Sequence, residues 1–118
     1  MRSAGQLDTI GFPDDVSDPL RQLRIDLLVE EVEETLLAES QNDPVEVADG
    51  LADIIVIAYG SLLAYWGPVV AEEILGEVAR SNLSKIVDGK VLRRADGKIL
   101  KPESFSPPDI RSILEREL

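Results

Sequence analysis

Apolar residues recur at spacings of three and four over most of residues 19–85, and this pattern predicts an all-α fold. The first helix is predicted to begin after Asp18, a good capping residue, because proline is favoured at the first helical position. It is predicted to run from Pro19 to about Glu39, since no Gly or Pro interrupts this stretch. Residues 1–17 lack periodicity and are predicted to form an N-terminal arm.

Two further helices are predicted before residue 86. The run Asp43-Pro44-Val45-Glu46 has the pattern of a capping box and starts a helix that is predicted to reach about Trp66. Gly67-Pro68 ends that helix and opens a third one, predicted to continue to about Lys85. The three helices of residues 19–85 are expected to pack as an antiparallel bundle.

The C-terminal third has a different pattern. Residues 86–106 are expected to form a basic loop or a short hairpin, in which residues 91–94 pair with residues 99–100 around Asp96-Gly97. Ser106-Pro107-Pro108-Asp109 is a helix-start signal, and a C-terminal helix is expected over residues 107–117. The length of 118 residues, without a linker between two cores, predicts one domain over residues 1–118.

The composition narrows the chemistry. The chain has no Cys and no His, which excludes thiol nucleophiles, imidazole bases and metal sites built from sulfur or imidazole. A metal ion would have to be held by oxygen atoms. The net charge of −11 also argues against nucleic acid or an anionic membrane as a partner.

The charge is divided along the sequence. Residues 1–79 contain 17 acidic and 3 basic residues, whereas residues 80–118 contain 6 acidic and 9 basic residues. The most apolar stretch, residues 51–70, is long enough to suggest a membrane span, but Asp53 lies within it and acidic residues flank it. A buried core helix of a cytoplasmic protein is the favoured interpretation, and no secretory signal is visible.

Carboxylates gather in the first predicted helix. Glu30, Glu31, Glu33 and Glu34 are four acidic residues in five positions, on a helix whose apolar residues occupy two opposite faces. Such a helix is expected to be largely buried, so repulsion between Glu30 and Glu34 would favour a bound cation. The alternative is that these carboxylates only keep an amphipathic helix soluble.

The second predicted helix carries Glu46, Asp49 and Asp53 at spacings of three and four, on one side. Glu46 has an alternative role in the capping box. Asp53 lies in an apolar run, where an unpartnered carboxylate would be costly. Two antiparallel helices that face each other with such groups would form an oxygen cage suited to Mg²⁺ or Mn²⁺.

The basic residues lie nearby in the sequence. They begin at Arg80 and continue through Lys85 to the segment of Arg94, Lys98 and Lys101. Beside a metal cage they would neutralise a polyphosphate. Alternatively, they balance the acidic part of the chain and favour the end of the third helix.

These residues together resemble the all-α nucleoside triphosphate pyrophosphohydrolases, which include MazG-like proteins, dimeric dUTPases and phosphoribosyl-ATP pyrophosphohydrolase. The shared pattern is ExxE on one helix and ExxD on the next. Glu31 and Glu34 match the first pair, Glu30 and Glu33 offer an overlapping register, and Asp53 matches the last aspartate. Gly50 stands where the second glutamate is expected, and Asp49 or Glu46 would replace it.

The resemblance extends to residues 77–85, 94–102 and 107–109, which look like the closing segment of a MazG-like subgroup with dUTPase-type members. It implies Mg²⁺-dependent cleavage of a nucleoside triphosphate to a monophosphate and pyrophosphate, for cleaning the nucleotide pool, by a homodimer or tetramer. Exposed apolar helix faces also favour a homo-oligomeric bundle. By this resemblance Glu31, Glu34 and Asp53, with Asp49 as a substitute, hold the metal ion and Glu30 is the general base. The implied phosphate contacts are Asn82, Lys85, and Arg94 or Lys98.

Two other functions stay open. The chain could be a non-enzymatic acidic interaction protein, in which case Mg²⁺ should change neither its stability nor its activity. It could also cleave phosphoribosyl-ATP, although the closing segment argues against that by analogy.

Overall fold

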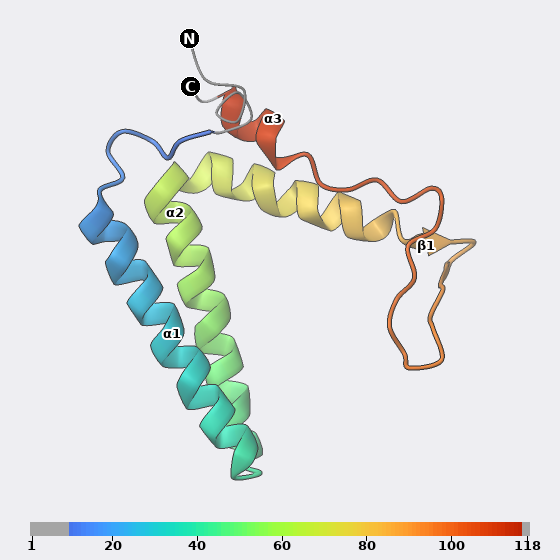
Figure 1. Ribbon diagram of the computed structural model, residues 1–118, viewed down its shortest axis with the longest axis horizontal. Coiled ribbons are helices and arrows are strands. Elements are labelled where there is room, and N and C mark those ends of the chain that lie inside the picture. Colours follow the sequence, from blue (N-terminus) through green and yellow to red (C-terminus); the bar gives the residue numbers. More distant parts are fainter. Residues whose placement is uncertain (1–9, 117–118) are drawn as a thin grey trace. The chain divides into compact units, whose positions relative to one another are not determined.

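The computed structural model describes residues 10–116 of the chain. Within them lie the helices α1 (Asp18–Ser40), α2 (Pro44–Leu83) and α3 (Ile110–Glu115), and the short strands β1 (Ile86–Val87) and β2 (Lys90–Val91), as Figure 1 shows. The predicted all-α class is confirmed. The chain divides into two compact units, one of residues 11–71 and one that contains the described residues from Glu72 onward.

Helix α1 begins one residue before the predicted position. Ser17 is the capping residue, and its hydroxyl accepts a hydrogen bond from the Leu20 N–H at 3.2 Å. The prediction that Asp18 caps the helix is therefore wrong by one position. Serine caps as well as aspartate does, and Asp18 in the first turn still interacts favourably with the positive end of the helix dipole.

Helix α2 begins as predicted. The Asp43 carboxylate accepts a hydrogen bond from the Glu46 N–H at 3.2 Å. The reciprocal half of the capping box is not formed, because the Asp43 N–H donates to the Ala38 carbonyl at 3.1 Å. The tight turn after α1 therefore uses the group that Glu46 would have bound, and the Glu46 carboxylate is exposed.

The predicted break inside α2 is also present. Gly67 has φ 82° and ψ 172°, a backbone conformation outside the helical region, and Pro68 follows it. This positive φ is costly for residues with a Cβ, which explains why glycine stands here. The helix therefore consists of two helical segments, and the second ends at Leu83, two residues before the predicted end.

In the first unit, α1 and the first segment of α2 lie side by side and run antiparallel (Figure 1). Two close approaches hold them together: Thr35 meets the backbone at Gly50, and Arg24 meets the backbone at Gly60. We call the line of contact through these two points the helix seam. Arg24, Glu31 and Thr35 lie on the α1 side of it, at spacings of seven and four residues.

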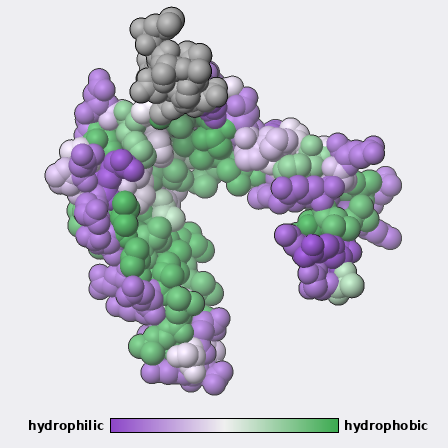
Figure 2. All heavy atoms as spheres, viewed as in Figure 1, coloured by the Kyte–Doolittle hydropathy of each residue, from purple (hydrophilic) through white to green (hydrophobic). Residues whose placement is uncertain are grey.

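The expectation that α1 is largely buried on both faces is wrong for the single chain. Thr35 and Ala38 are its buried residues, whereas Leu23 and Leu36 are 54% and 63% exposed. On α2, Ile55 and Val56 are 69% and 68% exposed. The reason is that α1 and the first segment of α2 cover each other on one face, whereas the buried apolar residues of α2 lie in its second segment, at Val70, Ala71 and Ile74. Figure 2 shows apolar residues along the first part of α2 and polar residues over much of α1.

Helix α2 is long and apolar enough, by length and composition alone, to cross a membrane. Only about a tenth of its most apolar window is buried, so it is not covered as the core helix of a monomer would be. A helix buried between copies of a soluble protein passes the same test of length and composition.

The second unit contains two turns. Strands β1 and β2 pair antiparallel around Asp88-Gly89, with φ values of 51° and 74° as in the tight turns of two-residue hairpins. This hairpin was missed, although an Asp-Gly pair between apolar residues is its usual signal. The predicted pairing around Asp96-Gly97 is present as a single bridge between Arg93 and Ile99, not as regular strands.

The last helix is shorter than predicted. It begins at Ile110, not at residue 107, because Asp109 is the capping residue and its carboxylate accepts from the Ser112 N–H at 3.1 Å. Pro107 precedes another proline, which disfavours the helical conformation at that residue. The helix ends at Glu115, and the predicted end at residue 117 lies outside the described residues.

Candidate functional site

The carboxylates of α1 lie beside the helix seam. Glu31 is half-buried, whereas Glu30 and Glu34 are exposed. Burial raises the pKa of the Glu31 carboxyl, and the negative charges of Glu34, Asp53, Glu30 and Asp49 raise it further, in that order. Four carboxylates from two helices are therefore near enough to act on a fifth, and we call these five residues the carboxylate cluster. They are the residues that sequence analysis selected as metal ligands and general base.

On α2, Asp49 is exposed and Asp53 is half-buried. The expectation that Asp53 is deeply buried in an apolar run is not met, because its neighbours Ile55 and Val56 are open to solvent in the single chain. Its charge nevertheless acts on Glu31 across the seam. Asp53 therefore belongs to the same cluster as the α1 carboxylates.

Gly50 is buried and occupies the position where a glutamate was expected. A Cβ at this position would stand 2.1 Å from the Thr35 Oγ1 and 3.1 Å from the Thr35 Cβ. The Thr35 hydroxyl donates to the Glu31 carbonyl oxygen at 2.7 Å, which fixes it in this place. No side chain fits at residue 50 without moving α1, so this position brings the two helices together and supplies no ligand.

The cluster is not a closed metal cage. Among residues 10–116, no three acidic side chains are close enough to hold one ion together. The donor chemistry fits Mg²⁺ or Mn²⁺, because all the groups are carboxylates and their mutual repulsion favours a cation. Closing a cage would require the long Glu31 and Glu34 side chains to turn toward Asp49 and Asp53.

The expected phosphate contacts lie in the second unit and form two separate pairs. The Lys85 ammonium donates to the Asn82 side-chain oxygen at 3.1 Å, and both residues line a cavity of about 660 Å³. Arg94 forms an ion pair with Asp96 at 2.7 Å, and the Lys98 N–H donates to the same carboxylate. The Arg94 guanidinium lowers the pKa of Asp96. The Arg94 charge is thus already compensated.

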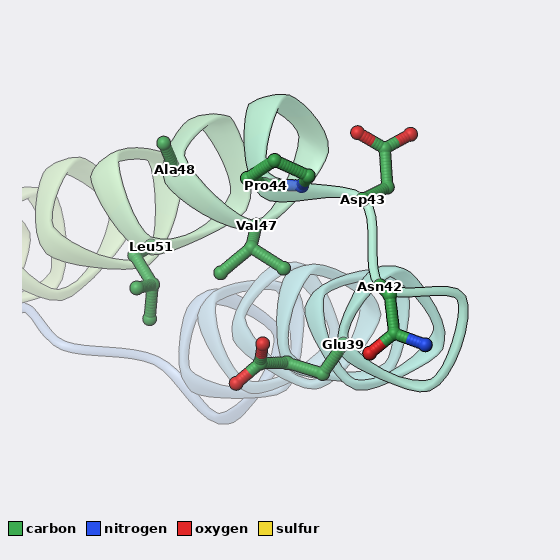
Figure 3. Close-up of a pocket in the computed structure, with 7 residues that line it drawn as sticks. All are labelled: Glu39, Asn42, Asp43, Pro44, Val47, Ala48 and Leu51. Atoms are coloured by element: carbon green, nitrogen blue, oxygen red, sulfur yellow. The ribbon is translucent and has the colours of Figure 1, made fainter.

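Two cavities lie near the turn between α1 and α2. The larger, of about 450 Å³, is shown in Figure 3, where Val47 and Leu51 point from α2 toward α1 and the Asp43 carboxylate points away. The smaller, of about 230 Å³, is lined by Glu34 together with Leu37, Ala38, Gln41 and Glu46. Glu34 therefore belongs to the carboxylate cluster and also lines this smaller cavity.

Two polar residues that make contacts between distant parts of the sequence were not among the predicted site residues. Arg24 crosses the seam and hydrogen-bonds to α2, and Glu77 binds both Arg80 and the backbone N–H of Asp109. A signal for Arg24 existed, since it lies seven residues before Glu31 and therefore on nearly the same helix face. Nothing in the sequence indicated that Glu77 reaches a residue 32 positions away.

The comparison with known families places the chain in the all-α nucleoside triphosphate pyrophosphohydrolase superfamily, to which MazG-like proteins belong. The family model of phosphoribosyl-ATP pyrophosphohydrolase matches residues 11–82. The chain belongs to this family, and the match covers the helix seam and every residue of the carboxylate cluster. No curated protein matches the chain.

Proposed function

We propose that this chain is a Mg²⁺-dependent nucleoside triphosphate pyrophosphohydrolase, which releases a nucleoside monophosphate and pyrophosphate. The observation that carries the proposal is the half-buried Glu31, whose carboxyl pKa is raised first by burial and further by four carboxylates from both sides of the seam. Such a cluster favours a divalent cation, which would neutralise the charge of a polyphosphate. Membership of a pyrophosphohydrolase family supports the same reaction class.

The proposed division of labour follows the geometry. Glu31, Glu34, Asp49 and Asp53 would hold the cation, because the charges of the other three act on Glu31 from both helices. Glu30 would accept the proton of the attacking water, since it is exposed at the edge of the cluster. Asn82, Lys85 and Lys98 remain proposed phosphate contacts, together with Arg94 if it leaves Asp96. A role in cleaning the nucleotide pool of the cytoplasm is also a proposal.

Phosphoribosyl-ATP is the second candidate substrate. The observation that favours it is the matching family model, whose description names this compound. The proposed site would treat both substrates alike, because each presents a polyphosphate to a cation and a general base. The choice depends on the groups that bind the rest of the nucleotide.

We propose further that a second copy of the chain covers the exposed apolar faces of α1 and α2, giving a homodimer or tetramer. Large apolar side chains that are more than half exposed on both helices support this, since a monomer rarely leaves so much apolar surface open. Light scattering of the purified chain should give a mass of at least twice 12.9 kDa. A mass of one chain, measured without detergent, would contradict the proposed homo-oligomer.

The test of function is pyrophosphate release from a panel of ribonucleotides, deoxyribonucleotides and phosphoribosyl-ATP, with Mg²⁺ and then with EDTA. Mg²⁺-dependent release from nucleoside triphosphates supports the proposal, and release from phosphoribosyl-ATP alone supports the second candidate. Silence across the panel in Mg²⁺ and in Mn²⁺ would refute both. The non-enzymatic acidic protein would then be the better explanation.

A further inference from the structure

Arg24 extends from α1 across the helix seam and is half-buried there. Its Nε donates to the Ser61 hydroxyl at 3.0 Å, and its Nη2 donates to the Ile57 carbonyl at 2.8 Å. The Ser61 hydroxyl donates to the same carbonyl at 3.2 Å. The guanidinium is therefore held in a fixed orientation by two oxygen atoms of α2, which are themselves joined by a hydrogen bond.

The notch that receives the guanidinium depends on two small residues, Gly60 and Ser61. A Cβ on Gly60 would stand 2.5 Å from the Arg24 Nη2 and 3.8 Å from its Nη1. Two of the five guanidinium N–H groups are used in the bonds to α2, and Nη1 makes no hydrogen bond within residues 10–116. Three N–H groups are thus available to another acceptor.

Arg24 also differs from the four arginines that form ion pairs within the described residues. Arg80, Arg94, Arg111 and Arg116 each contact a carboxylate. Arg24 contacts none in the part of the chain that the structure describes, although α1 carries an excess of acidic residues. A half-buried cation without a counter-ion favours an anionic ligand, because an anion would offset the cost of its desolvation.

The position of Arg24 along the seam suggests which anion this is. Arg24 precedes Glu31 by seven residues, which is about 10 Å along a helix. Its partner Ser61 follows Asp53 by eight residues, or about 12 Å. The guanidinium therefore lies at one end of the row of carboxylates, at a separation suited to an extended anion whose other end is bound through a cation.

We infer that Arg24 binds the terminal phosphate of the polyphosphate chain, with the nearer phosphates on the cation that the carboxylate cluster holds. This inference rests on the proposed function. The planar guanidinium can donate two parallel hydrogen bonds to one phosphate, which a lysine cannot do. Arg24 would then orient the pyrophosphate leaving group, while Gly60 and Ser61 keep the guanidinium aimed along the seam.

The test uses inorganic tripolyphosphate with Mg²⁺, because this probe requires neither a nucleobase pocket nor turnover. Calorimetric titration of the full chain should show binding, and Arg24→Gln should weaken it by about 10- to 100-fold, the value of hydrogen bonds to a charged group. Ser61→Ala is the matched control: it removes one anchor of Arg24 but keeps the charge, and binding should fall by much less.

Gly60→Ala separates phosphate binding from a role in holding the helices together. The added methyl should displace the flexible end of Arg24 and weaken tripolyphosphate binding severalfold. The protein should stay about as stable, because the helical preference of alanine over glycine offsets the loss of the Arg24 hydrogen bonds to α2. If Arg24 only joined the helices, binding would be unchanged in Gly60→Ala and in any folded Arg24→Gln protein.

The outcomes distinguish this inference from the proposed function. Arg24-dependent tripolyphosphate binding without hydrolysis of any nucleotide would leave the inference standing and refute the function. Nucleotide hydrolysis with an unchanged KM in Arg24→Gln would support the proposed function and refute the inference about Arg24. If Arg24→Gln fails to fold, wild-type binding by Gly60→Ala overturns the inference, and so does the absence of tripolyphosphate binding by the unaltered chain.

Discussion

The two units of the chain treat their carboxylates in opposite ways. From Glu72 onward, Glu77 binds Arg80 through two hydrogen bonds of 2.8 Å and accepts from the Asp109 N–H at 2.7 Å. These contacts lower the pKa of the Glu77 carboxyl to about 2. On the helix pair of residues 11–71, burial and repulsion raise the pKa of Glu31 instead.

The difference separates carboxylates that have partners from carboxylates that repel one another. Carboxylates in the second unit stabilise turns and caps, and their lowered pKa values reflect partners that are already present, as at Asp96 and Asp109. The carboxylates beside the helix seam repel one another, which destabilises the fold unless a cation binds.

The largest expected effect is on catalysis. Glu34→Gln should reduce Mg²⁺-dependent pyrophosphate release by more than about 100-fold, since even groups that only support a metal ligand are worth 10- to 100-fold. Its melting temperature should not fall, because the change removes repulsion at the cluster. Glu33→Gln is the control, because Glu33 is exposed and does not act on Glu31. A Glu34→Gln protein as active as the control would remove Glu34 from the site.

The next effect is on the helix contact. Gly50→Ala should lower the free energy of unfolding by about 1–3 kcal/mol, because the new Cβ would overlap Thr35. The matched control is Gly76→Ala, at a helical glycine with open space around it. This control should instead gain about 1 kcal/mol. Chemical denaturation of the two variants measures both values, and equal stabilities would show that α1 and α2 do not meet closely at residue 50.

The smallest effects are on the pH dependence of stability. Glu31 has a raised pKa, so its ionisation destabilises the folded protein. Glu31→Gln should therefore raise the melting temperature at pH 7, and this gain should vanish as the pH falls through the Glu31 pKa.

Glu77 has a lowered pKa, so its ionised form stabilises the folded protein. Glu77→Gln should therefore reduce the melting temperature at pH 7, and this loss should shrink between about pH 4.5 and pH 2. Parallel pH profiles for the two variants would show that the two units do not differ.

Local signals in the sequence predicted most of the fold. The Asp43 cap and the Gly67 break were predicted at their correct residues, because single side chains or the backbone of glycine determine them. The extent of burial was not predictable, since it depends on which faces a neighbour covers. The same holds for the carboxylate contacts of Glu77, which join residues distant in the sequence.

The candidate site was predicted in part. Helical spacing predicted Glu31 and Asp53 as members of one site, and the structure adds that the Asp53 charge acts on the Glu31 carboxyl. The role of Gly50 could not be predicted from the sequence, because it depends on a contact with Thr35 of the other helix. Arg24 was overlooked because its hydrogen bonds to Ile57 and Ser61 become visible only when the helices are paired.

The most direct test of the central claim is the melting temperature of the unaltered chain, measured as Mg²⁺ is added to protein freed of metal by EDTA and dialysis. If the carboxylate cluster is a cation site, the melting temperature should rise with Mg²⁺ concentration and saturate. The rise should persist in Glu33→Gln and disappear in Glu31→Gln. A melting temperature that stays constant in Mg²⁺ and in Mn²⁺, or a rise that Glu31→Gln retains in full, would contradict the account.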